Sequence, residues 1–238
     1  MNKIVDGRFQ HPLTAIIAGP SGVGKTTFVS QLIENSDKLF NVEFEYVDIY
    51  IGTMLEDNAI FQNLQKKVKN VRIIETQKQY PSPTVFESQF KKHFESIYKQ
   101  KKRGCIIFDD MMTELSKCGL ISDMFSKYSS HFDLTIIHIT QNLFYKGKDP
   151  NEHVTLYRNT HMLVLFKNPL DSTILSTVAR RLASGNKYKK LLHLFHTVLD
   201  KERYIIIYGG FKRNPQLQFT SDIFHFNPSY QKVYSITT

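Results

Sequence analysis

The sequence feature that most constrains this chain is a glycine-rich stretch between an apolar run and a helical pattern. The spacing G-x-x-x-x-G-K-[ST] is met by Gly19, Gly24, Lys25 and Thr26. Residues 13–18 before it are apolar and predict a strand, and residues 25–34 after it carry apolar side chains at helical spacing. A strand, a glycine turn and a helix in this order are typical of a phosphate-binding loop, the Walker A motif. An ordinary glycine turn is the alternative interpretation.

Each position of this stretch has a predicted task in holding a phosphate chain. Glycines allow successive backbone N–H groups to turn toward an anion, and the helix adds the positive end of its dipole. Lys25 is expected to reach the β- and γ-phosphates, and Thr26 is expected to place its hydroxyl on Mg²⁺. We therefore predict a site for ATP and Mg²⁺, with these nucleotide-binding residues: Gly19, Pro20, Ser21, Gly22, Val23, Gly24, Lys25, Thr26 and Thr27.

The bulk composition is that of an ordinary globular protein. The 238 residues are 41% hydrophobic and 22% charged, enough for one α/β domain with a sizeable core. No apolar run approaches the ~20 residues that span a bilayer, and residues 1–8 lack the apolar core of a signal peptide. Cys105 and Cys118 are too few for a disulfide framework. We expect an intracellular protein in the reducing cytoplasm or nucleus, with no membrane partner.

The net charge of +9 favours a polyanionic partner such as nucleic acid. A basic surface without such a partner stays the alternative at this point. Five of the nine histidines, at positions 131, 138, 161, 193 and 196, have no metal-ligand spacing, and we interpret them as structural or surface residues.

Strands and helices are predicted to alternate along residues 1–210. Strands are expected at 13–18, 44–51, 71–74, 105–110, 134–140, 162–166 and 204–208, and helices at 25–34, 60–68, 86–97, 171–182 and 191–199. This alternation predicts an α/β fold with a mainly parallel central sheet and helices on both faces. Residues 211–238 are polar and irregular, and we expect a partly ordered tail.

Polar side chains end two of the predicted strands, where ligands of parallel sheets bind. Asp109 follows four apolar residues, as the Mg²⁺-organising aspartate of a Walker B strand does. Asp110 is placed to act as a general base on a water molecule, and Gln141 could contact the γ-phosphate or that water. Ordinary polar residues at strand ends are the alternative for all three.

An arginine that completes the site is a further expectation. Arg158 is the first candidate for an arginine finger donated to a neighbouring subunit, and Arg180 or Arg181 is the rival, or a DNA contact. The stretch 186–189, Asn-Lys-Tyr-Lys, lacks the acid of a guanine-selecting N-K-x-D motif, which argues against a GTPase.

Together these motifs resemble the FtsK–HerA superfamily, and within it the poxvirus-type genome-packaging ATPases of large DNA viruses, virophages, adintoviruses and Maverick/Polinton elements. The segments that carry the resemblance are 11–13, 19–26, 107–112, 139–144, 158–159 and 165–169. It implies a RecA-like P-loop NTPase fold of the ASCE type, in which residues 134–140 form an extra strand between the Walker A and Walker B strands. Many relatives end the Walker B strand in Asp-Glu, where this chain has Asp109-Asp110.

The resemblance also implies a function. The family forms homo-oligomeric rings that use ATP to thread double-stranded DNA into a capsid, so capsid proteins are expected partners and the virion is a further expected location. Arg158 corresponds to the arginine that acts in trans. DNA phosphates would be contacted without sequence preference by basic residues facing a pore: Lys146, Lys148, Lys187, Lys189, Lys190 and the run 99–103.

Two other functions stay open from the sequence. A small-molecule or nucleotide kinase shares the phosphate-binding loop, but the chain has no compact arginine-rich lid. A non-catalytic nucleotide-binding interaction module is the second alternative. The intact set of Lys25, Thr26, Asp109 and Asp110 counts against it.

Overall fold

The computed structural model of the chain describes residues 8–54, 56, 58–76, 82–98, 102–111, 120–144, 152–208, 219–224 and 232–234. Over these residues the strands form one nine-stranded sheet in the order β3-β2-β4-β5-β1-β6-β7-β8-β9. The strands are β1 Thr14–Ala18, β2 Tyr46–Ile51, β3 Val71–Glu75, β4 Gly104–Asp109, β5 Leu134–Thr140, β6 Met162–Phe166, β7 Tyr204–Tyr208, β8 Phe219–Ser221 and β9 Lys232–Tyr234. The strands from β3 to β6 pair in parallel, and those from β6 to β9 pair antiparallel.

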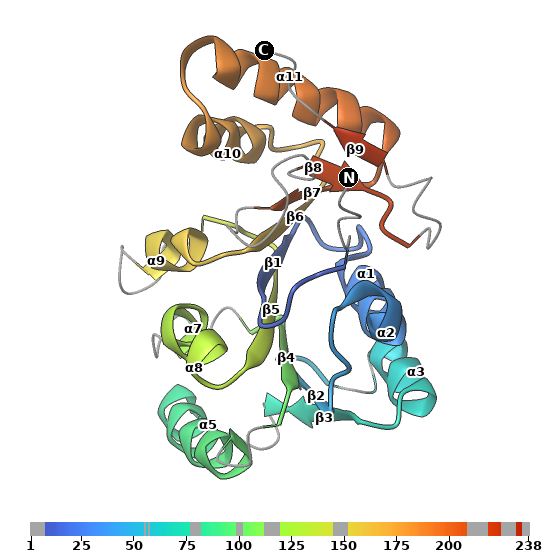
Figure 1. Cartoon of the computed structure of the whole chain (residues 1–238), viewed down its shortest axis with the longest axis vertical. Helices are drawn as coiled ribbons and strands as arrows, with labels where there is room; N and C mark the ends of the chain where they lie inside the picture. The colour runs from blue at the N-terminus through green and yellow to red at the C-terminus, as the bar shows by residue number, and fades with distance from the viewer. Residues whose placement is uncertain are drawn as a thin grey trace, which may run out of the picture.

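Helices cover both faces of the sheet (Figure 1). On one face lie α1 Lys25–Glu34, α2 Ser36–Leu39 and α3 Ala59–Lys67. The other face is covered by α5 Pro83–Tyr98, α7 Leu120–Asp123, the π-helical turn Met124–Tyr128, α8 Ser129–His131, α9 Glu152–Arg158, α10 Thr173–Leu182 and α11 Gly185–Lys201. No helix in the described ranges is both long and apolar enough to cross a bilayer.

The sheet separates two hydrophobic cores because side chains alternate along each strand. In β1, Ile16 and Ala18 pack on the side of α5, α10 and α11, whereas Ala15 and Ile17 pack on the side of α1 and α3. All five residues of β1 are buried, since β5 and β6 flank it in parallel and helices cover both faces. This central position fixes the point where the glycine-rich loop begins.

The predicted fold class, a RecA-like core with a mainly parallel sheet, is confirmed by the strand order. β5 pairs with β1 on one side and with β4 on the other, so it is the extra strand between the Walker A and Walker B strands. Parallel pairing brings the carboxyl ends of these three strands to one edge of the sheet.

Several elements differ from the sequence-based expectation. α11 begins at Gly185 rather than near 191, because its first turns are polar and carry no apolar stripe. α9 has no counterpart among the expected helices, and β8 and β9 lie within residues 211–238, for which the sequence predicts a partly irregular tail. These strands have only three residues each, too short for an alternating pattern to stand out.

Candidate nucleotide-binding site

The glycine-rich loop runs from the end of β1 into the first turn of α1. Gly22 and Gly24 have positive φ values of 77° and 100°, which an L side chain rarely adopts. Gly19 is required for a different reason, because a Cβ built on it would lie 2.6 Å from the Cβ of Phe166 on β6. The loop conformation therefore depends on glycine both for its turn and for its contact with β6.

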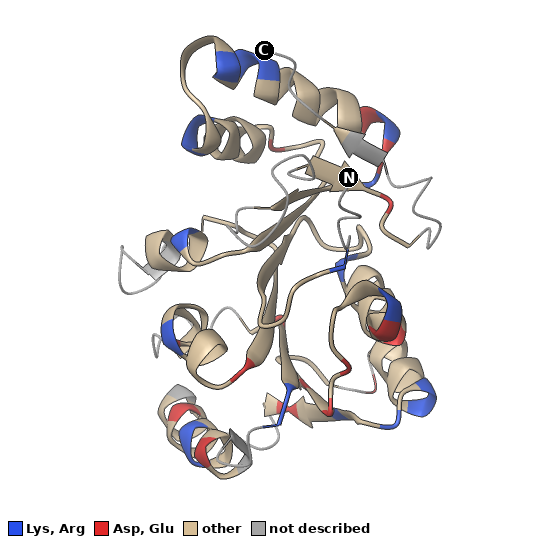
Figure 2. Cartoon of the chain, viewed as in Figure 1, with Lys and Arg blue, Asp and Glu red and all other residues tan. Residues whose placement is uncertain are grey.

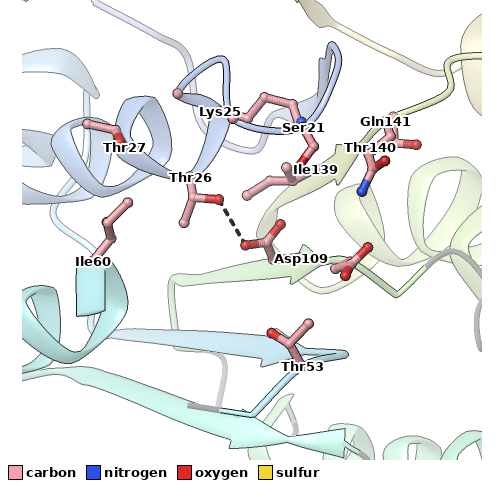
Figure 3. A pocket seen from close by; sticks show the side chains of 13 residues that line it. Ser21, Lys25, Thr26, Thr27, Thr53, Ile60, Asp109, Ile139, Thr140 and Gln141 are labelled. Carbon is pink, nitrogen blue, oxygen red and sulfur yellow. Dashed lines mark hydrogen bonds between the residues drawn. The ribbon is translucent and has the colours of Figure 1, made fainter. Parts of the chain in front are cut away.

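A cavity of about 290 Å³ lies in front of this loop, at the carboxyl edge of β4, β5 and β1 (Figure 3). It is lined by these predicted site residues: Ser21, Gly22, Gly24, Lys25, Thr26, Thr27, Asp109, Asp110 and Gln141. Four further residues, none of them among the predicted site residues, also line it: Thr53, Ile60, Ile139 and Thr140. Gly19, Pro20 and Val23 belong to the loop but not to the lining. The structure thus gathers most of the predicted site around one cavity.

Lys25 is folded over the loop that precedes it. Its Nζ donates hydrogen bonds to the carbonyl oxygens of Gly19 at 2.8 Å and Pro20 at 2.7 Å, and the side chain is buried. Burial lowers the pKa of Lys25, and the carboxylates of Asp109 and Asp110 act in the opposite direction. Backbone carbonyl groups therefore hold the Lys25 ammonium group at the cavity, where the negative charges of Asp109 and Asp110 attract it.

Thr26 and Asp109 form the contact that joins the two motifs. Thr26 Oγ1 donates a hydrogen bond to Asp109 Oδ2 at 3.1 Å (Figure 3). Burial raises the pKa of Asp109 to about 6, although the Thr26 hydroxyl and Lys25 both favour its ionised form. A hydroxyl and a carboxylate are oxygen ligands that suit Mg²⁺.

These two groups fit a magnesium ion that also binds phosphate. Among the described residues, no group of three His, Cys, Asp or Glu side chains could hold a metal ion by itself. Mg²⁺ is usually held by one or two carboxylates together with substrate phosphates and water. Thr26 and Asp109 would therefore hold the ion jointly with the nucleotide.

Asp110 leaves the strand immediately after Asp109. Its φ of 54° lies in the left-handed region, and its side chain is exposed at the cavity. The change of backbone direction separates the surroundings of the two acids, since Asp109 is buried beside Thr26. One carboxylate is thus placed for a metal ion and the other faces solvent in the same cavity.

Gln141 is presented by a turn at the end of β5. The Gly19 N–H donates to the Thr140 carbonyl at 3.3 Å, which joins this turn to the phosphate loop. The Thr140 hydroxyl accepts a bond from the Asn142 N–H at 3.2 Å, and Asn142 Oδ1 accepts one from the Phe144 N–H at 3.0 Å. Gln141 lies exposed between these fixed neighbours, at the end of the cavity opposite Thr27 and Ile60 (Figure 3).

The predicted arginines have different surroundings. Arg158 is exposed at the end of α9 and does not line the cavity of its own chain. The Arg181 guanidinium lies 4.6 Å from the ring centre of Phe144 and 4.7 Å from that of Tyr157. Arg181 is therefore occupied by contacts within its own chain.

Among the predicted DNA-contacting residues, Lys146, Lys148 and 99–101 lie outside the described residues.

Of the two cysteines, Cys118 also lies outside the described residues. Cys105 is fully buried in β4 as a free thiol.

No protein-family model matches the sequence, and no curated protein matches it. Solved structures with a similar fold include the genome packaging NTPase from Sulfolobus turreted icosahedral virus 2 in complex with ATP-gammaS. That match has 12% identity and a TM-score of 0.47, and covers 82% of this chain and 91% of that chain.

Two further matches are similarly distant. EssC (ATPases 2 and 3) from Geobacillus thermodenitrificans has 14% identity and a TM-score of 0.42, over 70% of this chain and 35% of that chain. A KaiC-like protein from the archaeon Pyrococcus horikoshii has 13% identity and a TM-score of 0.46, over 71% and 80%. At these identities and TM-scores the matches carry no argument about function, which rests on the residues of the cavity.

Proposed function

We propose that this chain is a Mg²⁺-dependent ATPase that drives double-stranded DNA into the capsid of a virus or virus-like element. The observation that carries the ATPase part is the Thr26–Asp109 hydrogen bond, in a cavity that also holds Lys25, Asp110 and Gln141. This set combines groups for a phosphate chain, for a metal ion and for an attacking water molecule at one strand edge.

Each residue has a distinct task in the proposed hydrolysis. The loop N–H groups and Lys25 bind the phosphates, and Thr26 with Asp109 holds Mg²⁺, which neutralises charge on the β- and γ-oxygens. Asp110 accepts a proton from the attacking water, and Gln141 orients that water or the γ-phosphate. Arg158 is exposed and outside its own cavity, which suits an arginine given to a neighbouring subunit.

The DNA part of the proposal is supported by charge. Lys and Arg gather at the connected ends of α10 and α11 (Figure 2), where Arg180, Lys187, Lys189 and Lys190 are exposed. We call these four residues the basic tip. The first turn of α11 contains Lys187 and no acidic residue. A cation at this end is unfavourable, because it is repelled by the positive end of the helix dipole. A phosphate backbone would offset that repulsion.

The test is the ATPase rate of the purified chain with and without double-stranded DNA, from low to moderate salt. We expect stimulation by DNA that is lost as salt rises, since phosphate contacts release counterions. Lys25→Ala should abolish hydrolysis. An ATPase rate that DNA leaves unchanged at every salt concentration would reject the translocase, and transfer of phosphate to a nucleoside instead of water would indicate a kinase.

Assembly is tested separately by imaging particles with an ATP analogue and duplex DNA. A closed ring around the duplex is the expected result. Single subunits bound along the DNA under the same conditions would contradict it.

A further inference from the structure

The end of β2 makes an unusually close contact with the backbone around Asp110. The register pairs Ile51 with Asp109, and the Gly52 N–H then donates to the Asp109 carbonyl oxygen at 3.0 Å. A Cβ built on Gly52 would lie 2.1 Å from the Asp110 carbonyl oxygen and 2.9 Å from its carbonyl carbon. These are backbone atoms, so no side chain can rotate away to make room.

This contact involves both peptide groups that flank Asp110. The Asp109 carbonyl belongs to the peptide group before Asp110, and the Asp110 carbonyl belongs to the one after it. The φ and ψ angles of Asp110 are the rotations between these two planes. Gly52 hydrogen-bonds to the first plane and abuts the second, so it constrains both angles.

Asp110 needs such a constraint because its φ of 54° is unfavourable for a residue with a side chain. A conformation of this kind costs about 1 kcal/mol or more and persists only where the surroundings enforce it. On the far side of Asp110, Met111 is fully buried in the core. The backbone of Asp110 is thus held between the contact with Gly52 on one side and the buried Met111 on the other.

The end of β2 is itself fixed from the opposite side. The buried hydroxyl of Thr76, which follows β3, donates to the Ile51 carbonyl at 2.8 Å. The end of β2 is therefore hydrogen-bonded on both sides, to Asp109 through Gly52 and to Thr76 through Ile51, and loss of either bond would leave a buried polar group unsatisfied.

The next residue, Thr53, reaches the cavity. Thr53 lies two residues beyond Ile51, the last residue of β2, which packs in the core beneath α1 and α3. Thr53 is half-buried and lines the cavity together with Asp109 and Asp110 (Figure 3). Its hydroxyl can both donate and accept a hydrogen bond there.

We propose that the Gly52-Thr53 turn sets the geometry of water activation, which rests on the ATPase function proposed above. Gly52 is a positioning residue that acts through Asp110, and the Thr53 hydroxyl holds the attacking water beside the Asp110 carboxylate. The water oxygen bonds to the γ-phosphorus as the bond to the β-phosphate oxygen breaks. The water proton passes to Asp110, and ADP leaves with the bonding electrons.

The first test is Gly52→Ala, measured by steady-state hydrolysis and by titration with a fluorescent ATP analogue. We expect kcat to fall on the order of 100-fold, as for a catalytic group displaced by about 1 Å, with nucleotide affinity nearly unchanged. Gly185→Ala is the matched control, since Gly185 also has a positive φ, 59°, but its Cβ would meet no atom within 4 Å. That variant should lose stability and keep its DNA-free ATPase rate.

A double-mutant cycle separates positioning from general damage. If Gly52 acts through Asp110, Gly52→Ala should have almost no further effect on kcat in an Asp110→Asn background. Multiplying effects of the two substitutions would overturn the inference. Thr53→Val should lower kcat about tenfold and Thr53→Ser should restore it, because only a hydroxyl is needed. This pair decides the matter if Gly52→Ala fails to fold, and a Thr53→Val variant with the wild-type rate would overturn the Thr53 part.

The wild-type control keeps the two proposals apart. A wild-type protein that binds ATP without hydrolysing it would reject the proposed function. If the wild-type protein hydrolyses ATP and the Gly52→Ala variant does so at the same rate, only the positioning role of Gly52 is rejected.

Discussion

Thr26 Oγ1 and Asp109 Oδ2 lie 3.1 Å apart although 83 residues separate them in the sequence. Thr26 lies in the first turn of α1, which follows β1, and Asp109 ends β4; β1 and β4 are not neighbours, since β5 lies between them. Two strand spacings amount to about 10 Å, so the contact forms only because the phosphate loop extends across the end of β5. β5 pairs with both β1 and β4, and it therefore sets the position of the phosphate loop relative to Asp109.

Thr26→Val tests the metal role of this pair. The variant keeps its size but loses the hydroxyl, so we expect the Mg²⁺-dependent part of nucleotide affinity to fall about tenfold or more, or ~1.4 kcal/mol. Affinity measured with a metal chelator present should change little. Thr26→Ser keeps the hydroxyl and is the control. Equal loss with and without Mg²⁺ would show that Thr26 contacts the nucleotide rather than the metal ion.

Asp109→Asn should make the protein more stable and inactive. The pKa of Asp109 rises from 3.8 to about 6 on folding because the carboxyl is buried, so its ionised form is destabilising at pH 7. The expected gain in the free energy of unfolding is up to about 3 kcal/mol at pH 7. The gain should shrink as pH falls through 6 toward 4, where the wild-type carboxyl is protonated. Denaturant unfolding at several pH values measures it, and a variant less stable than wild type at pH 7 would contradict it.

His138 should make the fold sensitive to acid. Burial lowers its pKa from 6.5 to about 4, and among the described residues nothing pairs with its Nδ1. Because the unfolded chain takes up this proton first, stability present above pH 6.5 is lost as pH falls through 6.5 toward 4, by up to about 3 kcal/mol. His138→Leu should remove this loss. Asp109 has the opposite pH dependence below 6, so the difference between variant and wild type is the quantity to measure.

Arg158 and Arg181 should give different results when subunits are mixed. If Arg158 acts in trans, Arg158→Ala and Lys25→Ala subunits are each inactive, but a mixture regains activity where an intact Lys25 site meets an intact Arg158. Arg181→Ala should instead lose about 1 kcal/mol of stability, because its guanidinium packs on Phe144 and Tyr157. Arg181→Lys is its control. A mixture that stays inactive would remove Arg158 as the finger.

Motifs that are read locally could be predicted from the sequence. The phosphate loop has its own residue spacing and β5 is a run of mostly apolar residues, so each can be identified without knowledge of its partners. Asp109 and Gln141 followed because apolar strands ended there. Their position at a common edge needed only the rule for parallel sheets.

The Gly52-Thr53 turn could not be predicted in the same way. In sequence it is a glycine that ends a strand, and nothing local distinguishes it from other strand ends. Its importance comes from the pairing of Ile51 with Asp109, which brings together residues far apart in the chain. The stacking of Arg181 on Phe144 depends likewise on how α10 packs. The sequence alone therefore cannot remove Arg181 from the candidates for the arginine finger.

The close approach of Gly19 to Phe166 packs the phosphate loop directly against β6. With only 2.6 Å between the Cβ of Phe166 and a Cβ built on Gly19, a side chain at this position would push the loop away from β6. A residue larger than glycine at position 19 would therefore shift the start of α1, and with it the Thr26 hydroxyl, relative to Asp109.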